Sequence, residues 1–242
     1  MNIAIFCTSI LAAGVASVTG FGVGSIITPV LSLYLPTKLA IAATSIPHLV
    51  ATALRFWMLR SHVDRKVLIG FGLTSAIGGL IGALLHAQFE TPSIALIFGV
   101  ILIFSGFMGA SGFSERLRFN GIGAWIGGAV SGILGGLVGN QGGIRSAALL
   151  SFNIPKSAFV ATATAIALIV DGARMPIYMA TQSSEILARL DLISIATAGV
   201  IIGTIAGARV LRGINEVTFR RIVSSLIFLL GTFMLYKGIR QQ

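Results

Sequence analysis

The chain has 242 residues, of which 55% are hydrophobic and only 10% are charged, and its mean hydropathy is +0.97. In soluble domains about a quarter of all residues are charged. This composition therefore excludes an ordinary soluble protein and indicates a multi-pass protein of the lipid bilayer. The formal net charge is +10, but Lys and Arg mostly separate apolar runs, which is typical of membrane topology signals and gives no indication of nucleic acid binding.

Eight apolar runs follow one another along the chain. Their approximate bounds are 1–37, 39–59, 67–89, 91–114, 119–155, 157–180, 190–211 and 217–236. Six have the length of one membrane crossing, for which about 20 residues suffice. The runs at 1–37 and 119–155 are too long for one upright helix and short for two crossings with a turn. Each contains a glycine cluster, GFGVG at 20–24 and GNQGG at 139–143.

Glycines, prolines and arginines align between the two halves of the chain. At an offset of 119 the aligned pairs are Gly24 with Gly143, Pro36 with Pro155, Thr52 with Asp171 and Arg55 with Arg174. At an offset of 125 they are Gly78 with Gly203, Gly82 with Gly207 and Gly106 with Gly231. The sequence therefore predicts two copies of a four-segment unit, residues 1–114 and 120–238, within one transmembrane domain that covers residues 1–242.

The distribution of positive charge favours inverted repeats. If the first segment of each repeat enters the membrane and returns, ten of the fourteen Lys and Arg residues outside the spans fall on one side and four on the other. Eight plain crossings give a weaker split of eight against six. Because cytoplasmic loops are rich in Lys and Arg, the re-entrant arrangement is preferred, with both termini outside. The predicted fold is an all-α polytopic membrane protein with about eight hydrophobic helical segments.

The two glycine breaks predict a shared interior site. Non-helical backbone survives at membrane depth only where protein or a water-filled cavity satisfies it, and a helix that restarts after a break directs free N–H groups toward an anion. The candidate substrate-binding residues here are Gly20, Phe21, Gly22, Gly24 and Ser25 in the first break and Asn140, Gln141, Gly142, Gly143 and Arg145 in the second. The alternative is close helix packing, which we expect for the glycines at 78, 82, 203 and 207.

A polar stripe follows the second segment of each half. At about 100° per residue, Thr44, His48, Thr52 and Arg55 lie within an arc of about 80° on one helix, and Thr164, Asp171 and Arg174 do so on the other. We expect Thr44, Ser45, Thr162, Thr164 and Arg174 to contribute to substrate binding.

Asp171 is the only acidic residue deep in a span, and its spacing allows a pair with Arg174. Asp171 and His48 are candidates for proton coupling, and the alternative for each is a structural polar contact. Arg55 lies nearer the end of its span, where snorkelling to the interface is an equal alternative to ligand contact. His62 and His86 lie near loops and carry little weight.

No pattern in the sequence indicates catalysis. There is no HExxH motif, no acid and base at short spacing and no Ser-His-Asp set, and the single Cys7 has no Cys or His partner at metal-ligand spacing. We therefore expect no catalytic residue, no metal site and no cofactor.

The stretches "GFGVGSIITPVLSLYLP" followed by "AATS", and "GLVGNQGGIRSAALLSFNIP" followed by "AFVATATA", carry a resemblance over essentially the whole chain. They resemble the TauE/SafE family of membrane transporters, although the first copy lacks the fuller glycine triplet of many members. The resemblance implies a multi-pass protein of the bacterial inner membrane that exports sulfur-containing anions such as sulfite or organosulfonates.

The leading hypothesis is a secondary transporter that exports a small sulfur-containing or other organic or inorganic oxyanion through a midplane site between the repeats. An anion channel that uses the same residues is the alternative, and a membrane-embedded enzyme is a weaker one. The expected partners are the lipid bilayer and a small anionic substrate, while proton coupling and homo-oligomerisation stay open.

Overall fold

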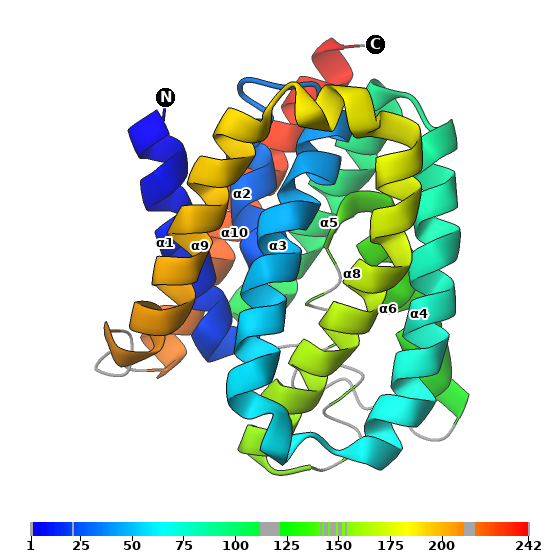
Figure 1. Ribbon diagram of the computed structural model, residues 1–242, viewed down its shortest axis with the longest axis vertical. Helices are drawn as coiled ribbons and strands as arrows, with labels where there is room; N and C mark the ends of the chain where they lie inside the picture. The colour runs from blue at the N-terminus through cyan, green and yellow to red at the C-terminus, as the bar shows by residue number, and fades with distance from the viewer. Residues whose placement is uncertain are drawn as a thin grey trace.

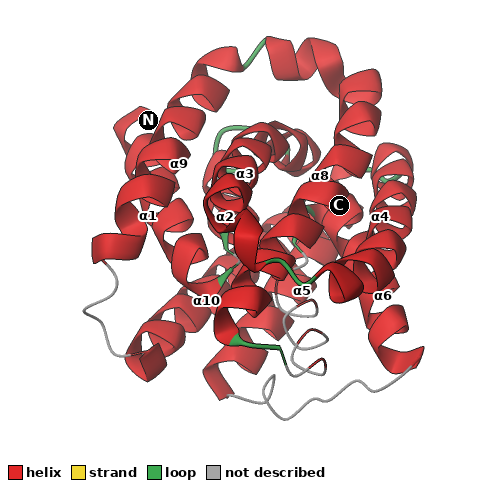
Figure 2. Ribbon diagram, turned by 60° about the horizontal axis from the view of Figure 1, so that its bottom comes forward, coloured by secondary structure: helices red, strands yellow, loops and turns green. Residues whose placement is uncertain are grey.

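A computed structural model describes residues 2–20, 22–111, 122–140, 142, 145, 149, 152, 154–210 and 216–241; the side chains of residues 124, 156, 207–210 and 216–220 are not described. Over these ranges the regular secondary structure is helical (Figure 2). The helices are α1 (Asn2–Thr19), α2 (Val23–Leu31), α3 (Thr37–Leu59), the 3-10 helix η1 (Arg60–His62), α4 (Arg65–Gln88), α5 (Thr91–Ser111), α6 (Ile122–Val138), α8 (Lys156–Leu187), α9 (Leu190–Val210) and α10 (Glu216–Arg240). Within the described ranges, six helices are long and apolar enough to cross a membrane, and α6 and α9 contain shorter apolar segments. The predicted all-α, multi-pass class is confirmed.

The first apolar run is broken and turns back. Gly20 and Gly22 have φ angles of 81° and 123°, which glycine adopts without steric penalty, and they separate α1 from α2. Helix α2 runs back toward the end of the molecule where α1 begins, and both termini lie at that end (Figure 1). There Lys237 of α10 donates hydrogen bonds to the carbonyls of Ser32 and Leu35, just after α2.

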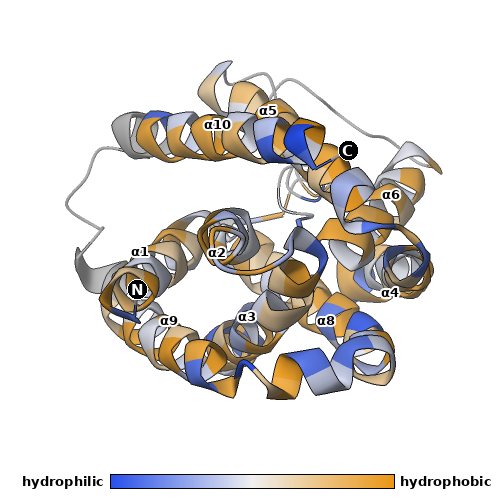
Figure 3. Ribbon diagram, turned by 90° about the horizontal axis from the view of Figure 1, so that it is seen from above, coloured by the Kyte–Doolittle hydropathy of each residue, from blue (hydrophilic) through white to orange (hydrophobic). Residues whose placement is uncertain are grey.

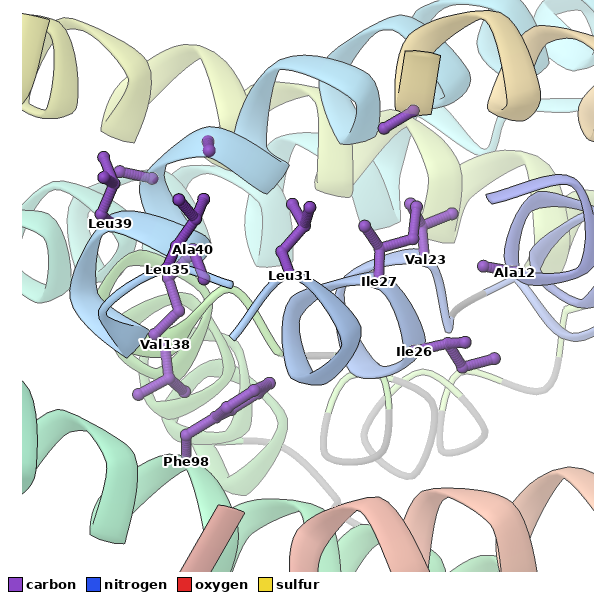
Figure 4. Packing of buried hydrophobic residues seen from close by; sticks show 14 of the residues in the cluster. Ala12, Val23, Ile26, Ile27, Leu31, Leu35, Leu39, Ala40, Phe98 and Val138 are labelled. Atoms are coloured by element: carbon purple, nitrogen blue, oxygen red, sulfur yellow. The ribbon is translucent and has the colours of Figure 1, made fainter. Parts of the chain in front are cut away.

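Helix α2 lies in the middle of the helices, surrounded by protein (Figure 3). Eight of its nine residues are buried, so it presents no lipid-facing side. Val23, Ile27 and Leu31 belong to one apolar cluster with Phe98 of α5 and Val138 of α6 (Figure 4). At about 1.5 Å per residue, nine residues span roughly half of the hydrocarbon core. Such a short helix is compatible with this depth because neighbouring helices surround its sides.

The second long run also returns to the end from which it started. Helix α6 runs beside α4 in the same direction, since Gly70 lies against Trp125 and Gly82 against Ile133. Helix α8 begins near the start of α4, because the backbone N–H of Asp64, the N-cap of α4, donates to Thr162 at 2.9 Å. Thus α6 and α8 both begin at the end of the molecule where α4 begins.

Two pairs of helices, α4 with α6 and α9 with α1, pack closely through glycine residues. A Cβ at Gly82 would lie 2.1 Å from the carbonyl oxygen of Ile133 in α6, and one at Gly203 would lie 2.2 Å from that of Ile10 in α1. Contacts this short require the absence of a side chain. The structure thus agrees with the expected packing role of the glycines at 78, 82 and 203; the surroundings of the glycine at 207 are outside the description.

Candidate functional site

The glycine breaks of the two halves meet at one small buried cavity. Its lining residues are Gly22, Gly24, Ser25, His48, Gly139, Asn140, Gly142 and Arg145. The approach is close, since a Cβ at Gly24 would lie 2.5 Å from the carbonyl oxygen of Gly139. The cavity volume of about 10 Å³ accommodates roughly one water molecule. The structure therefore brings candidates from both breaks together in a compact conformation.

The start of α2 contributes hydrogen-bond donors to this cavity. The first N–H groups of a helix have no acceptor within the helix, and the N-cap residue Gly22 has no side chain that could supply one. Gly24 and Ser25, in the first turn, line the cavity. The helix dipole adds a partial positive charge at the same place, which favours an anion.

Arg145 places a cation beside these N–H groups. Its side chain is buried, and Nη2 donates to the carbonyl of Gly20 at 3.1 Å. Within the described part of the chain, Nε and Nη1 of Arg145 have no hydrogen-bond partner, and neither does Nδ2 of Asn140. Unsatisfied buried donors are costly, so these groups favour an acceptor-rich ligand.

His48 connects the cavity with a buried ion pair on α8. Nδ1 of His48 lies 2.7 Å from Oδ2 of Asp171. The other carboxylate oxygen, Oδ1, accepts from Nε of Arg174 at 3.1 Å and forms an ion pair with Nη2 at 2.8 Å. The pair expected from the spacing of Asp171 and Arg174 is present. Asp171 thereby contacts both His48, which lines the cavity, and an arginine that does not.

Three side chains hold the last carbonyls of α6 before its break. Arg174 Nη1 donates to Gly135 at 3.0 Å, the hydroxyl of Tyr178 donates to Gly136 at 2.5 Å, and Nδ1 of His86 lies 2.7 Å from the carbonyl oxygen of Leu137. The carbonyl of Gly135 also accepts from the backbone N–H of Gly139 at 3.0 Å. Because the last carbonyls of a helix lack further partners within it, these side chains help to satisfy the end of α6 inside the protein.

Tyr178 and His86 were not among the candidates from the sequence. Tyr178 follows Arg174 by four residues and so lies on the same face of α8, and this spacing could have indicated that Tyr178 belongs to the polar stripe. His86 was set aside as a residue near a loop, whereas the structure buries it with its ring 4.7 Å from that of Tyr178. Arg174, expected to bind substrate, is occupied by Asp171 and the end of α6.

The predicted hydroxyl groups are not among the cavity's lining residues. Thr44 and Ser45 donate to carbonyls of their own helix, Thr162 accepts from the Asp64 N–H, and Thr164 is buried without a hydrogen-bond partner in the described part of the protein. The candidates Phe21, Gln141 and Gly143 lie outside the described residues. Arg55 is only 4% exposed, so it does not snorkel to the surface.

Positive charge exceeds negative charge at this depth. Among the described buried residues, Arg55, Arg145 and Arg174 face the single carboxylate of Asp171, which pairs with Arg174. A buried cation without a counter-ion costs several kcal/mol. No group of three His, Cys, Asp or Glu side chains among the described residues could hold a metal ion. Among the described residues, the buried charge near the cavity is thus predominantly positive.

Comparison with known proteins gives one match. A family model described as "Sulfite exporter TauE/SafE" matches residues 5–234, which is nearly the whole chain. No curated protein and no solved structure matches.

Proposed function

The chain belongs to the TauE/SafE family of plasma-membrane transporters, and on this premise we propose that it exports a small oxyanion such as sulfite through the cavity at the two glycine breaks. Members of this family are transporters rather than enzymes. The observation that carries the proposal is the buried Arg145, which has two nitrogen atoms free of described partners and faces the start of α2 across the cavity. Sulfite and sulfonates present several oxygen atoms, which accept hydrogen bonds from such donors.

Equivalent helix contacts support two inverted repeats. A Cβ at Gly106 would meet the backbone N of Phe228 and O of Ser224, and one at Gly231 would meet those of Ile103 and Gly99. Adding 125 to the numbers 103 and 99 gives 228 and 224, so the offset found in the sequence relates both contacts. The pair of α4 with α6 likewise corresponds to the pair of α9 with α1. Antiparallel packing of α5 with α10 is the arrangement expected for inverted copies.

The orientation follows from positive charge. Helices α3, α5 and α9 end at the same end of the molecule at which α4, α6, α8 and α10 begin. Ten Lys and Arg residues fall in or beside these connections, against four at the other end. We assign the ten-residue end to the cytoplasm, which places both termini outside.

The narrow cavity supports a carrier rather than an open channel. In this conformation the cavity has room for about one water molecule, which supports transport by a change of conformation that opens the site to each side in turn. His48 contacts both the cavity and Asp171, and these two residues are our candidates for proton coupling.

The test uses purified protein in detergent and in proteoliposomes, with sulfite as the ligand. Sulfite at 100 times its dissociation constant stabilises a one-site protein by about 2.7 kcal/mol. We expect Arg145→Gln to lose this stabilisation and sulfite flux, and we expect the exposed control Arg189→Gln to keep both. Wild-type protein without sulfite-dependent flux, or Arg145→Gln with wild-type affinity, contradicts the proposal. Large single-channel conductance supports a channel instead.

A further inference from the structure

Arg55 is the second buried arginine without an acidic partner in the described part of the protein. It is 4% exposed, and its Nε and Nη1 have no hydrogen-bond partner there. It follows His48 by seven residues on α3 and so lies on the same side of the helix, two turns toward the end of α3. His48, on that same side of α3, lines the cavity and lies 2.7 Å from Asp171. Arg55 therefore belongs to the polar cluster around the cavity, although it does not line the cavity itself.

Arg55 aligns with Arg174 at the offset of 119, and their surroundings differ in one respect. Three residues before Arg174 lies Asp171, which neutralises it. Three residues before Arg55 lies Thr52, whose hydroxyl donates to the carbonyl of His48 at 2.6 Å and carries no charge. Arg174 also donates to the end of α6, whereas two nitrogen atoms of Arg55 donate to no described group. The charge of Arg55 is therefore left for a ligand.

We propose that Arg55 forms a second anion site, which a transported oxyanion occupies between the cytoplasmic end of α3 and the central cavity. This inference rests on the proposed transport function and deepens it. Arg55 lies four residues before the end of α3, and Arg60, Arg65 and Lys66 follow it at the same end of the molecule. The cavity lies beside His48, two helical turns deeper in the protein than Arg55 when α3 is followed back from its C-terminal end. An anion drawn to the basic end therefore meets Arg55 before it meets Arg145.

The first test separates transport from binding at the cavity. In Arg55→Gln, the sulfite concentration that gives half-maximal thermal stabilisation should stay within about twofold of wild type, because Arg145 is intact. The initial rate of sulfite transport at low sulfite should fall about tenfold, a factor equivalent to about 1.4 kcal/mol. Arg55→Lys should recover part of that rate, since it retains the charge.

The second test supplies Arg55 with the counter-ion that Arg174 has. Thr52→Asp places a carboxylate three residues before Arg55, as in the other half, and Thr52→Asn is the uncharged control. We expect Thr52→Asp to reduce transport at low sulfite clearly more than Thr52→Asn; both variants lose the contact of the Thr52 hydroxyl with Nδ1 of His48 at 3.3 Å, so the difference between them reports the added charge. This pair also decides the matter if Arg55→Gln does not fold.

Three outcomes overturn the second site. Wild-type transport in Arg55→Gln shows that Arg55 is not on the path. Loss of cavity binding to the same degree as in Arg145→Gln shows that it belongs to the central site. Equal transport in Thr52→Asp and Thr52→Asn shows that the charge of Arg55 is not used. In each case the wild type still transports sulfite, whereas failure of the proposed function appears as a wild type without sulfite flux.

Discussion

Replacing Asp171 with Asn tests whether the buried carboxylate stabilises the protein by neutralising its neighbours. Asp171 is fully buried, accepts a hydrogen bond from Nε of Arg174 at 3.1 Å, forms an ion pair with Nη2 of Arg174 at 2.8 Å and lies 2.7 Å from His48. Asn keeps the shape but leaves the guanidinium of Arg174, 2% exposed, without a counter-ion. Removing one partner of a buried ion pair costs about 3–5 kcal/mol. At about 2–4 °C per kcal/mol for a chain of this size, the expected loss in Tm is on the order of 10 °C.

A double-mutant cycle in detergent, followed by thermal unfolding, measures the pair itself. Arg174→Gln alone leaves Asp171 with His48, so we expect it to cost less than Asp171→Asn. In the double variant both charges are absent, and the loss should be smaller than the sum of the single losses by about 1–3 kcal/mol. A Tm of Asp171→Asn within about 2 °C of wild type, or additive losses in the double variant, would refute the assignment of Asp171 as the counter-ion.

Three further changes probe the backbone contacts by thermal unfolding. Gly82→Ala forces a Cβ against a carbonyl of α6 and should destabilise the protein by about 1–3 kcal/mol. The exposed control Gly172→Ala, whose Cβ would have no atom within 4 Å, should be neutral or stabilising. Equal effects of the two substitutions would contradict the contact. Tyr178→Phe leaves a buried carbonyl unsatisfied and should cost about 1–3 kcal/mol without changing sulfite affinity, and unchanged stability would argue against this hydrogen bond. Gly22→Ala introduces a side chain at a φ of 123° and should cost about 1–3 kcal/mol, so a wild-type Tm would show that the break adopts another conformation.

The helical class was predictable because run length and glycine placement act locally. The run at 1–37 is too long for one helix, and its cluster at 20–24 contains Gly20 and Gly22, the two residues with positive φ that break it. The predicted bounds of the single crossings agree with α3, α4 and α5 to within a few residues. Helix α8 continues to Leu187, beyond the predicted end at residue 180. Element bounds follow from such signals because charged residues end apolar segments at the interface.

Part of the site depends on contacts that the sequence does not display. Arg174 was predicted to bind substrate, and that stays a prediction; the structure shows its guanidinium in contact with Asp171 and with the end of α6. The roles of Tyr178 and His86 depend on where α6 ends, which lies about 40 to 50 residues away along the chain from each of them. Which arginine is occupied and which is free is therefore a property of tertiary packing.

The complete burial of α2 has a consequence for how the protein is made. A nine-residue segment with buried sides all around gains little from contact with lipid, so it cannot settle as an independent membrane-inserted helix. Its far end is held by Lys237, about 200 residues later in the chain. We therefore expect α2 to reach its final packing only after α10 has been inserted, because α10 supplies the contacts at that end of α2. The packing around α2, a helix of the first half, is thus completed by the helix that is synthesised last among those described.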